Sequence, residues 1–220
     1  MGWYGFNSGS KRGITAHGCG TVAARAAMCT TLSAAVGGLA CVFLGRICSK
    51  TFDVRMVCNG ILASLVSITA GCAHTLPWAA GLIGGVGALV YYAASRLLLR
   101  LQVDDPLDAF PIHGACGMWG VLAVGLFAYP EYTAMAWDDG SEAASYCGLL
   151  YGCGMLFAAQ LVALLVEVLW VGGLASTLFW GLRLGRVLRV SAEIEAIGID
   201  VSKHGGAAYA PGVWVTRPKS

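Results

Sequence analysis

The sequence predicts an all-α membrane protein. Of its 220 residues, 57% are hydrophobic and only 12% are charged, whereas soluble domains carry about 25% charged residues. The apolar residues lie in runs long enough to cross a bilayer, which requires about 20 of them in a helix. Backbone groups inside a membrane must satisfy one another's hydrogen bonds, so such runs are expected to be helical. The net charge of +2 is small and scattered, so the composition predicts no nucleic-acid partner.

Long apolar segments divide the chain. Residues 2–10 are typical of the last turns of a transmembrane helix, and a polar loop is expected after them. Full spans are expected at residues 22–47, 54–73, 78–99, 106–128 and 146–182. The last of these exceeds the bilayer thickness, so it must tilt, bend or project beyond the membrane. An acidic loop is expected at 129–146, and residues 190–220 are expected to form a soluble tail.

Positive charge alternates between the loops and predicts the orientation. The basic loops carry Arg46, Lys50 and Arg55, then Arg96 and Arg100, then Arg183, Arg186 and Arg189. The loops between them are acidic or nearly neutral. By the positive-inside rule, the basic loops and the tail face the cytoplasm and the acidic loop faces outward. Lys11, Arg12 and Arg25 are exceptions, and Arg25 is expected to extend its long side chain to the interface.

An ionisable residue at membrane depth distinguishes the central span. His113 lies inside the apolar run 106–128, and such a residue is a candidate functional group by default. On a helix, Ala109, His113, Gly117 and Gly120 share one face. That face is small except for the imidazole, which suits either a close helix contact or a narrow passage. A histidine with all its hydrogen bonds satisfied in a packed core is the alternative.

Acidic residues precede this span and resemble a helix start. Asp105 is predicted to be the N-cap, Pro106 the first helical residue and Asp108 an acid in the first turn. Both carboxylates are therefore predicted to be structural. Pro111 is expected to kink the helix, because its ring displaces the carbonyl four residues earlier.

Trp3, Phe6 and Ser10 are separated by three and four residues, so they share one helical face. Such a stripe is most often a packing surface. An aromatic face also attracts ammonium-like cations by about 0.5–2 kcal/mol, and a neighbouring hydroxyl can accept a hydrogen bond. From these residues alone, both interpretations stay open.

The cysteines predict neither a disulfide framework nor a metal site. Most of the nine lie inside apolar runs, where they behave as small hydrophobic residues; among these are Cys29, Cys41, Cys58, Cys116 and Cys153. His113 and Cys116 are spaced as half a metal site, but no second pair accompanies them. No metal or other cofactor is expected. A membrane enzyme or metalloprotein built on His113 and Cys116 is the second class of function considered.

Four stretches resemble the ammonium transporter family, which includes the Amt, Mep and Rh proteins. The segment 104–128, DDPLDAFPIHGACGMWGVLAVGLFA, resembles the signature of the family's second half. GWYGFNSGS at 2–10 resembles the end of its sixth helix, and residues 58–72 resemble its eighth. Residues 198–209 resemble its cytoplasmic tail motif. The stretches occur in the family's order, and they resemble the plant and algal members of the family more than the others.

The resemblance implies a partial Amt-type helical bundle. The chain would supply about five and a half of the family's eleven transmembrane helices, one half of a fold built from two repeats. Residues 1–189 would be the transmembrane part and 190–220 the cytoplasmic tail. The chain is accordingly expected to be a C-terminal fragment that does not conduct without the other half.

The resemblance also implies transmembrane transport of ammonium or ammonia, without enzymatic activity. Ammonium would be recruited, deprotonated and conducted through a hydrophobic pore. Trp3 would line this pore, Phe6 would gate it and Ser10 would recruit the ion. His113 would be the second of two paired pore histidines, with Ala109 on the same pathway face. A transport-incompetent assembly or signalling subunit and an Rh-like gas channel are the alternatives within this resemblance.

The resemblance implies two kinds of partner, a lipid membrane and other subunits, and the plasma membrane is the expected location. A homotrimer or a hetero-assembly with related subunits is expected. The tail would dock on neighbouring subunits and is a possible site for a cytoplasmic regulator, and Ser202 occupies the position of a phosphorylatable Thr in plant relatives. Glu167 is a further acid at membrane depth, and no role is assigned to it.

Overall fold

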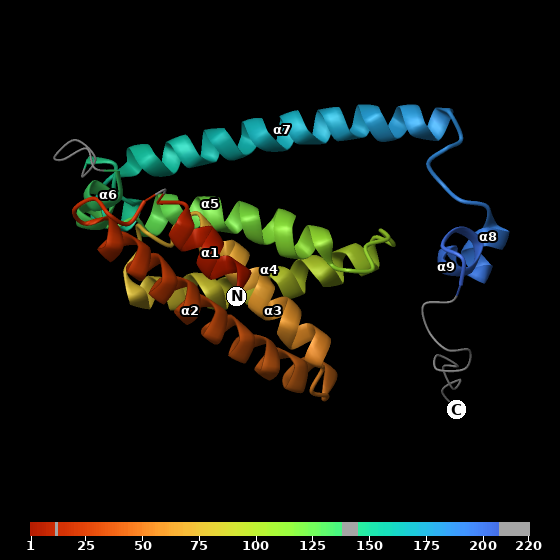
Figure 1. The fold of residues 1–220 in the computed structure, drawn as a ribbon, viewed down its shortest axis with the longest axis horizontal. Coiled ribbons are helices and arrows are strands. Elements are labelled where there is room, and N and C mark those ends of the chain that lie inside the picture. The colour runs from red at the N-terminus through yellow and green to blue at the C-terminus, as the bar shows by residue number, and fades with distance from the viewer. Residues whose placement is uncertain (12, 138–144, 207–220) are drawn as a thin grey trace. The chain divides into compact units, whose positions relative to one another are not determined.

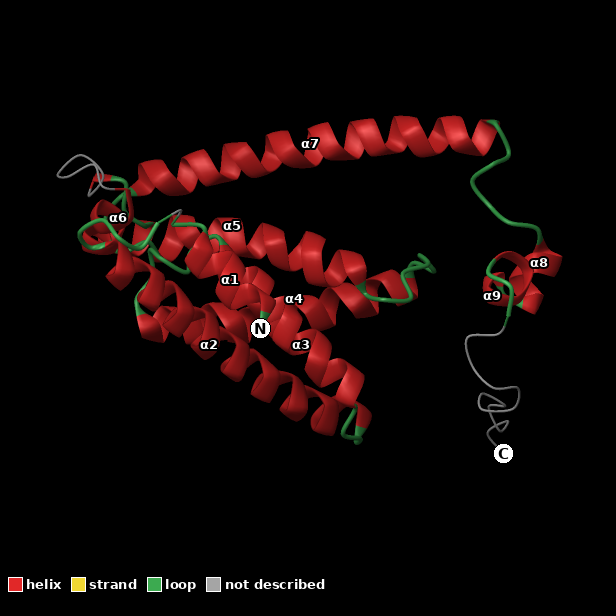
Figure 2. Cartoon of the chain, in the orientation of Figure 1, coloured by secondary structure: helices red, strands yellow, loops and turns green. Residues whose placement is uncertain are grey.

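The computed structural model describes residues 1–11, 13–137 and 145–206. Within these ranges the regular elements are helices, and one isolated bridge pairs Thr75 with Ala128 (Figure 2). The chain divides into two compact units, Met1–Val166 and Glu167–Ser220. The predicted all-α fold is confirmed.

The first unit is a bundle of helices. Its elements are α1 (Gly2–Gly9), α2 (Cys19–Leu44) with a π-helical end (Gly45–Ser49), α3 (Val54–Thr69), α4 (Pro77–Arg100), the π-helical turn η2 (Phe110–Ala115), α5 (Cys116–Phe127), α6 (Pro130–Trp137) and the turn η4 (Leu149–Tyr151). The helices α2, α3 and α4 pack against one another, α5 packs on α3 and α4, and α1 packs on α2 (Figure 1). Helix α7 (Gly154–Leu184) contains the boundary between the two units.

Four helical segments in the described part of the chain are long and apolar enough to cross a membrane. They are Cys19–Cys48, Pro77–Arg100, Phe110–Phe127 and Gly154–Leu184. The shorter apolar helix α3 has 16 residues. Because four such segments occur in one chain, the protein is a multi-pass membrane protein, as the apolar runs predict.

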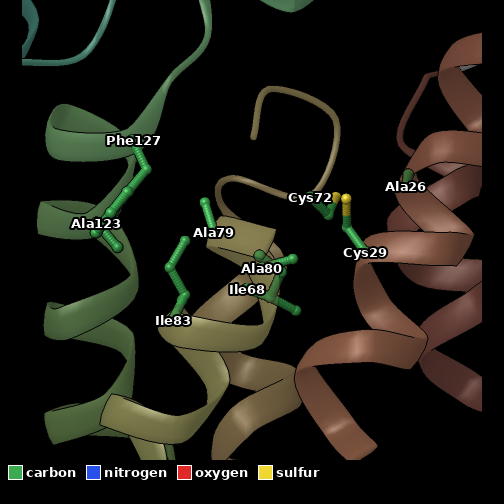
Figure 3. Close-up of a cluster of buried hydrophobic side chains, with 9 residues drawn as sticks. All are labelled: Ala26, Cys29, Ile68, Cys72, Ala79, Ala80, Ile83, Ala123 and Phe127. Atoms are coloured by element: carbon green, nitrogen blue, oxygen red, sulfur yellow. The ribbon is translucent and has the colours of Figure 1, made fainter. Parts of the chain in front are cut away.

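Small residues let the helices of the bundle approach closely. One core cluster joins four helices and the turn after α3 (Figure 3): Ala26, Cys29, Ile68, Cys72, Ala79, Ala80, Ile83, Ala123 and Phe127. A methyl group on Gly120 would lie 2.6 Å from the Ser67 carbonyl oxygen, so the backbones of α5 and α3 are nearly in contact. In a membrane, where lipid is as apolar as the core, such close van der Waals packing is a main source of helix association.

Two predicted helix boundaries are wrong. The span expected at 54–73 ends at Thr69. The chain after it is held by the bridge from Thr75 to Ala128 and by the His74 backbone carbonyl, which accepts a hydrogen bond from the N–H of Tyr129 at 2.8 Å. The central helix begins at residues 109–110 rather than at Pro106, so Asp105 is not its N-cap residue and Asp108 precedes its first turn.

The later start of the central helix also changes the role of Pro111. This residue lies in the first helical turn, where an N–H group would have no helical acceptor. The carbonyl four residues earlier belongs to Leu107, which lies outside the helix. The predicted kink is therefore wrong, because the proline removes no helical hydrogen bond.

The segment between α5 and α7 differs most from the prediction. Part of the expected loop 129–146 forms helix α6, and the acids Asp138, Asp139 and Glu142 lie outside the described residues. The apolar stretch expected to be continuous from 146 becomes helical only at Gly154. A disulfide joins Cys147 to Cys153, so the expectation that Cys153 is a simple hydrophobic residue is wrong. Gly148 anchors this loop by donating its N–H to the Ala128 carbonyl at 2.7 Å.

Arg25 is buried rather than extended to the interface. Its residue exposure is 7%, its guanidinium lies 3.4 Å from the centre of the Tyr132 ring, and Nη1 donates to the Ala73 carbonyl at 3.2 Å. The prediction that it reaches the interface is wrong because α6 covers it, with Tyr132 and Met135 both contacting the side chain.

The second unit contains the rest of α7 and the tail. Two short helices, α8 (Ala192–Ile197) and α9 (Ile199–Lys203), are separated by Gly198 at φ 94°. Such a positive φ is readily adopted only by glycine. An exposed ion pair joins Arg189 to Glu195 at 3.5 Å. The tail-motif residues Ala208 and Tyr209 lie outside the described residues.

Candidate functional site

Helix α1 is held against the bundle by side-chain hydrogen bonds. The indole Nε1 of Trp3 donates to Thr69 Oγ1 at 3.0 Å, which ties α1 to the end of α3. Asn7 Nδ2 donates to Thr30 Oγ1 at 2.8 Å, and Ser8 Oγ donates to the Ala23 carbonyl at 3.0 Å, which tie it to α2. These bonds fix how α1 is rotated and so where its aromatic side chains lie.

The π-helical turn η2 carries His113. Pro111 and Ile112 are buried, whereas His113, the next residue, is exposed in this chain. A π-helix has hydrogen bonds one residue longer than an α-helix, and single turns of this kind occur frequently at functional sites. In this turn the imidazole of His113 therefore points away from the core, whereas the side chains of its two preceding neighbours point into it.

The two carboxylates before η2 make different contacts. Asp105 accepts hydrogen bonds from the N–H groups of Ala109 and Phe110 at 2.8 and 2.9 Å, which otherwise lack acceptors at a helix start. Asp108 is 8% exposed and accepts hydrogen bonds from Ser95 Oγ, Tyr91 Oη and Asn59 Nδ2 at 2.7, 3.1 and 3.2 Å. Asp105 thus binds local backbone, and Asp108 binds neighbouring helices.

An apolar pocket of about 590 Å³ lies between α1, α3 and α5. Its lining residues are Gly2, Trp3, Phe6, Val66, Thr69, Ala70, His113, Gly117 and Val121. Phe6 remains 63% exposed in this chain. The structure therefore brings together Trp3, Phe6 and His113, which lie far apart in the sequence.

The remaining predicted pathway residues do not line this pocket. Ser10 donates its hydroxyl to the Phe6 carbonyl at 2.7 Å and lines a neighbouring pocket. Ala109 is exposed at the start of the central helix. Gly120 is buried against Ser67, because the π-helical turn breaks the regular spacing from Ala109 to Gly120 that a continuous α-helix would give.

The neighbouring pocket is polar and has a volume of about 430 Å³. It is lined by Asn7, Ser10, Lys11, Val22, Ala26, Thr69, Ala70, Cys72, Ala73, His74, Ala136 and Trp137. Thr69 and Ala70 line both pockets. The sequence did not predict that Thr69 and His74 line a pocket, because the other walls of that pocket come from distant parts of the chain. Their polarity at the end of an apolar run is the local signal that could have indicated it.

His74 is held in its neutral form by its surroundings. Burial of the ring, and secondarily the positive charge of Arg25, lowers the pKa of His74 to about 4. Its ring centre lies 6.3 Å from that of Trp137, with the ring planes at 33°. Because a neutral imidazole is not repelled by nearby cations, His74 can lie near Arg25 without an electrostatic penalty.

His113 and Cys116 do not form half a metal site. Cys116 is fully buried and its thiol donates to the Gly87 carbonyl at 3.4 Å, whereas His113 lines the apolar pocket. No group of three or more His, Cys, Asp or Glu residues within the described ranges is placed to hold a metal ion.

Comparison with known proteins decides the family. The sequence profile of the Ammonium Transporter Family matches residues 1–209. The chain belongs to this family. The resemblance seen in the sequence motifs is therefore confirmed across almost the whole chain.

The relatives include plant proteins. Ammonium transporter 1 member 3 of Solanum lycopersicum is 40% identical over 218 residues, which cover 95% of this chain and 47% of the relative. Ammonium transporter 1 member 2 of Arabidopsis thaliana is 40% identical over 96% of this chain and 42% of the relative. The expected likeness to the plant type is confirmed. The chain spans less than half the length of these relatives.

Solved structures of the family share the fold. Mep2 of Saccharomyces cerevisiae superposes with a TM-score of 0.74 at 29% identity, covering 86% of this chain and 41% of the other. A protein described as a sensor Amt protein superposes with a TM-score of 0.76 at 27% identity, covering 92% of this chain and 46% of the other. The expected partial Amt-type bundle is confirmed.

Proposed function

We propose that this protein carries ammonium or ammonia across a membrane, along a pathway that includes the apolar pocket of Trp3, Phe6 and His113. Membership of the Ammonium Transporter Family supports the substrate. The observation that carries the proposal is the position of His113, an imidazole that lines an otherwise apolar pocket together with two aromatic side chains.

The chemistry of the pocket suits a cation that sheds its proton before crossing. Moving a charged ion out of water into apolar surroundings is costly, whereas ammonia is neutral. Aromatic faces attract an ammonium ion at the entrance. The imidazole of His113 accepts the proton on a ring nitrogen and can return it, while the ammonia passes along the apolar walls. This role describes a transporter rather than an enzyme, because the substrate leaves unchanged.

Phe6 and Ser10 have separate roles in this proposal. Phe6, exposed and aromatic, narrows the way to His113. Ser10, the C-cap residue of α1, lies one turn after Phe6 and donates its hydrogen to the Phe6 carbonyl. Its oxygen lone pairs can accept a hydrogen bond from an arriving ion. Ala109 is exposed at the start of the central helix, and its place in the proposed pathway is beyond the apolar pocket.

The test is ammonium uptake by cells that lack transporters of their own. The protein, expressed from its complete coding sequence, is expected to restore growth on ammonium as sole nitrogen source and to take up ammonium in preference to potassium. Protein in the membrane is quantified in the same cells. Correctly inserted protein that moves no ammonium above the empty-vector control would overturn the proposal.

The orientation proposed from the charges has the tail in the cytoplasm and the α5–α7 connection outside. The Cys147–Cys153 disulfide supports this orientation, because disulfides persist in oxidising extracellular or lumenal surroundings and are rare in the cytosol. The plasma membrane is the proposed location. An impermeant thiol reagent applied to intact cells after reduction should label these cysteines, and labelling only after permeabilisation would reverse the orientation.

We also propose that the subunit works in an assembly, as a homotrimer or with related subunits. An apolar groove of about 790 Å³ on α2 and α4, lined by residues such as Leu32, Val36 and Trp78, supports this proposal. The mass of the detergent-solubilised complex tests it. Residues 190–220 would act as a cytoplasmic regulatory arm with Ser202 as its modification site, and equal transport by Ser202→Asp, Ser202→Ala and the parent would exclude that switch.

A further inference from the structure

We propose that Asp108 is a positioning residue for His113: its carboxylate ties the first turn of the central helix to α3 and α4 and thereby sets the direction in which the imidazole enters the apolar pocket. The proposal deepens the transport function described above and rests on it for one of its two tests. No contact between Asp108 and the transported species is part of the proposal.

The carboxylate of Asp108 is held by three donors from two other helices. Oδ1 accepts from Ser95 Oγ at 2.7 Å, and Oδ2 accepts from Tyr91 Oη at 3.1 Å and Asn59 Nδ2 at 3.2 Å. Asn59 belongs to α3, and Tyr91 and Ser95 belong to α4. Within the described residues no Lys, Arg or His forms an ion pair with Asp108. A buried carboxylate without a counter-ion requires its hydrogen bonds, so the position of Asp108 is tightly specified.

The backbone of Asp108 is also fixed. Its φ is +55°, in the left-handed region, which non-glycine residues seldom occupy unless their surroundings impose it. Its carbonyl accepts the N–H of Ile112 at 3.0 Å. The same residue therefore sets the backbone conformation before the helix, anchors the chain to two helices and accepts one of the first hydrogen bonds of the helical turn that follows.

Tyr91 transmits this anchoring to the residue beside His113. Its hydroxyl binds Asp108, while its side chain packs in a core cluster with Ile112 and Cys116. Ile112 is only 4% exposed. With Ile112 fixed on the core side and the turn π-helical, His113 is directed to the other side, into the apolar pocket. A movement of Asp108 relative to α4 would rotate both residues.

Asp105 does not make comparable contacts. Its carboxylate accepts hydrogen bonds from the backbone N–H groups of Ala109 and Phe110, so it stabilises the same turn without tying it to α3 or α4. Asp105 thus helps the turn to form, whereas Asp108 fixes where the turn lies relative to α3 and α4. This difference assigns the positioning role to Asp108.

The first test compares Tyr91→Phe with Tyr92→Phe, because the two substitutions remove the same hydroxyl from adjacent residues of α4 and only that of Tyr91 binds Asp108. Tyr91→Phe and Asp108→Asn are each expected to lower the ammonium-to-potassium uptake ratio by about tenfold, the effect of losing one hydrogen bond to a charged group. Tyr92→Phe is expected to leave it unchanged. In a His113→Ala background, Tyr91→Phe should have no further effect on the ratio, since the positioned ring is absent.

The second test does not depend on transport. The resonance of the His113 ring is identified in the histidine-labelled protein as the one lost in His113→Ala. Tyr91→Phe is expected to shift or broaden this resonance and Tyr92→Phe to leave it in place. The positioning role is overturned if Tyr91→Phe leaves the His113 resonance unshifted. It is also overturned if Tyr91→Phe changes the uptake ratio by the same factor in the parent and in His113→Ala. Failure of the parent protein to move ammonium overturns the proposed function instead, and the ring resonance still decides this inference.

Discussion

The two histidines on either side of Thr69 and Ala70 show how strongly surroundings determine what an imidazole can do. His113 lies in a π-helical turn and lines an apolar pocket beside Trp3 and Phe6. His74 lies in the turn after α3 and lines the adjacent polar pocket, close to Arg25 and Trp137. The two pockets share the Thr69–Ala70 wall.

The difference teaches that polarity alone does not identify the functional histidine. The more polar pocket contains the histidine that is held neutral, because burial and a neighbouring guanidinium disfavour its charged form. The apolar pocket contains the histidine whose ring is exposed. We therefore propose proton exchange for His113 and a structural role for His74. The predictions below test this division, from the largest expected effect to the smallest.

Replacement of His113 should have the largest effect. His113→Ala is expected to lower ammonium uptake by about 100-fold, the usual contribution of a positioned proton acceptor, and any remaining uptake should discriminate poorly against potassium. Uptake per amount of membrane protein is measured for both ions. His74→Gln, the matched control in the other pocket, should keep the selectivity of the parent. Unchanged uptake and selectivity in His113→Ala would exclude the assigned role.

His74 should instead control stability at acidic pH. Its pKa is lowered from 6.5 in the unfolded chain to about 4 in the folded one, so the unfolded state binds the proton more readily. The stabilisation is present above pH 6.5 and is lost as the pH falls towards 4, by about 3 kcal/mol in total. Melting temperatures in detergent should fall over this range for the parent and less steeply for His74→Gln. Parallel curves would show that His74 is not the group responsible.

Phe6 and Ser10 should differ in the kind of effect they produce. Phe6→Ala removes an aromatic side chain from the pocket wall and is expected to raise passage of potassium relative to ammonium. Ser10→Ala is expected to weaken apparent ammonium affinity by about 1 kcal/mol, or roughly fivefold, through loss of one hydrogen bond. Concentration-dependent uptake distinguishes the two. If both variants behave as the parent does, the stripe on α1 is a packing surface only.

The smallest effect is expected at Asp105. Asp105→Ala should lower the stability of the folded protein by about 1 kcal/mol, because it removes the acceptor for two N–H groups of the first turn, while Asp105→Asn should preserve most of it. Thermal stability and protein yield measure this difference. Equal loss of transport in both variants at normal yield would reveal an electrostatic role that the hydrogen bonds alone do not explain.

The apolar runs predict the helices well, because burial in a membrane leaves the backbone few alternatives. They do not predict where the central helix begins. Asp105 and Pro106 form a plausible helix start by themselves, yet the helix begins several residues later. The reason is tertiary: Asp108 turns the chain to reach Asn59 and Ser95, and these partners are far away in the sequence.

The sequence motifs predict the grouping of Trp3, Phe6 and His113 through family resemblance, and helical periodicity alone does not. Ser10 shares their predicted face but lines the other pocket. The Cys147–Cys153 disulfide escapes prediction because Cys153 lies in a long apolar run that suggests continuous helix. The close approach of Gly148 to the end of α5 closes that loop, and no local pattern encodes such an approach.

The π-helical turn at Phe110–Ala115 has a consequence for how relatives should be aligned and how insertions are tolerated. A turn of this kind is an α-helix with one additional residue. Deleting one residue between Phe110 and Ala115 should therefore restore a regular helix and leave everything from Cys116 onward in register. Residues before the deletion should also keep the faces that they have now, because the wider π-helical turn absorbs the additional residue locally. In a relative with a single-residue gap here, counting forwards from the equivalent of Asp105 and backwards from that of Cys116 gives different residues, so the equivalent of His113 must be identified by the face on which it lies.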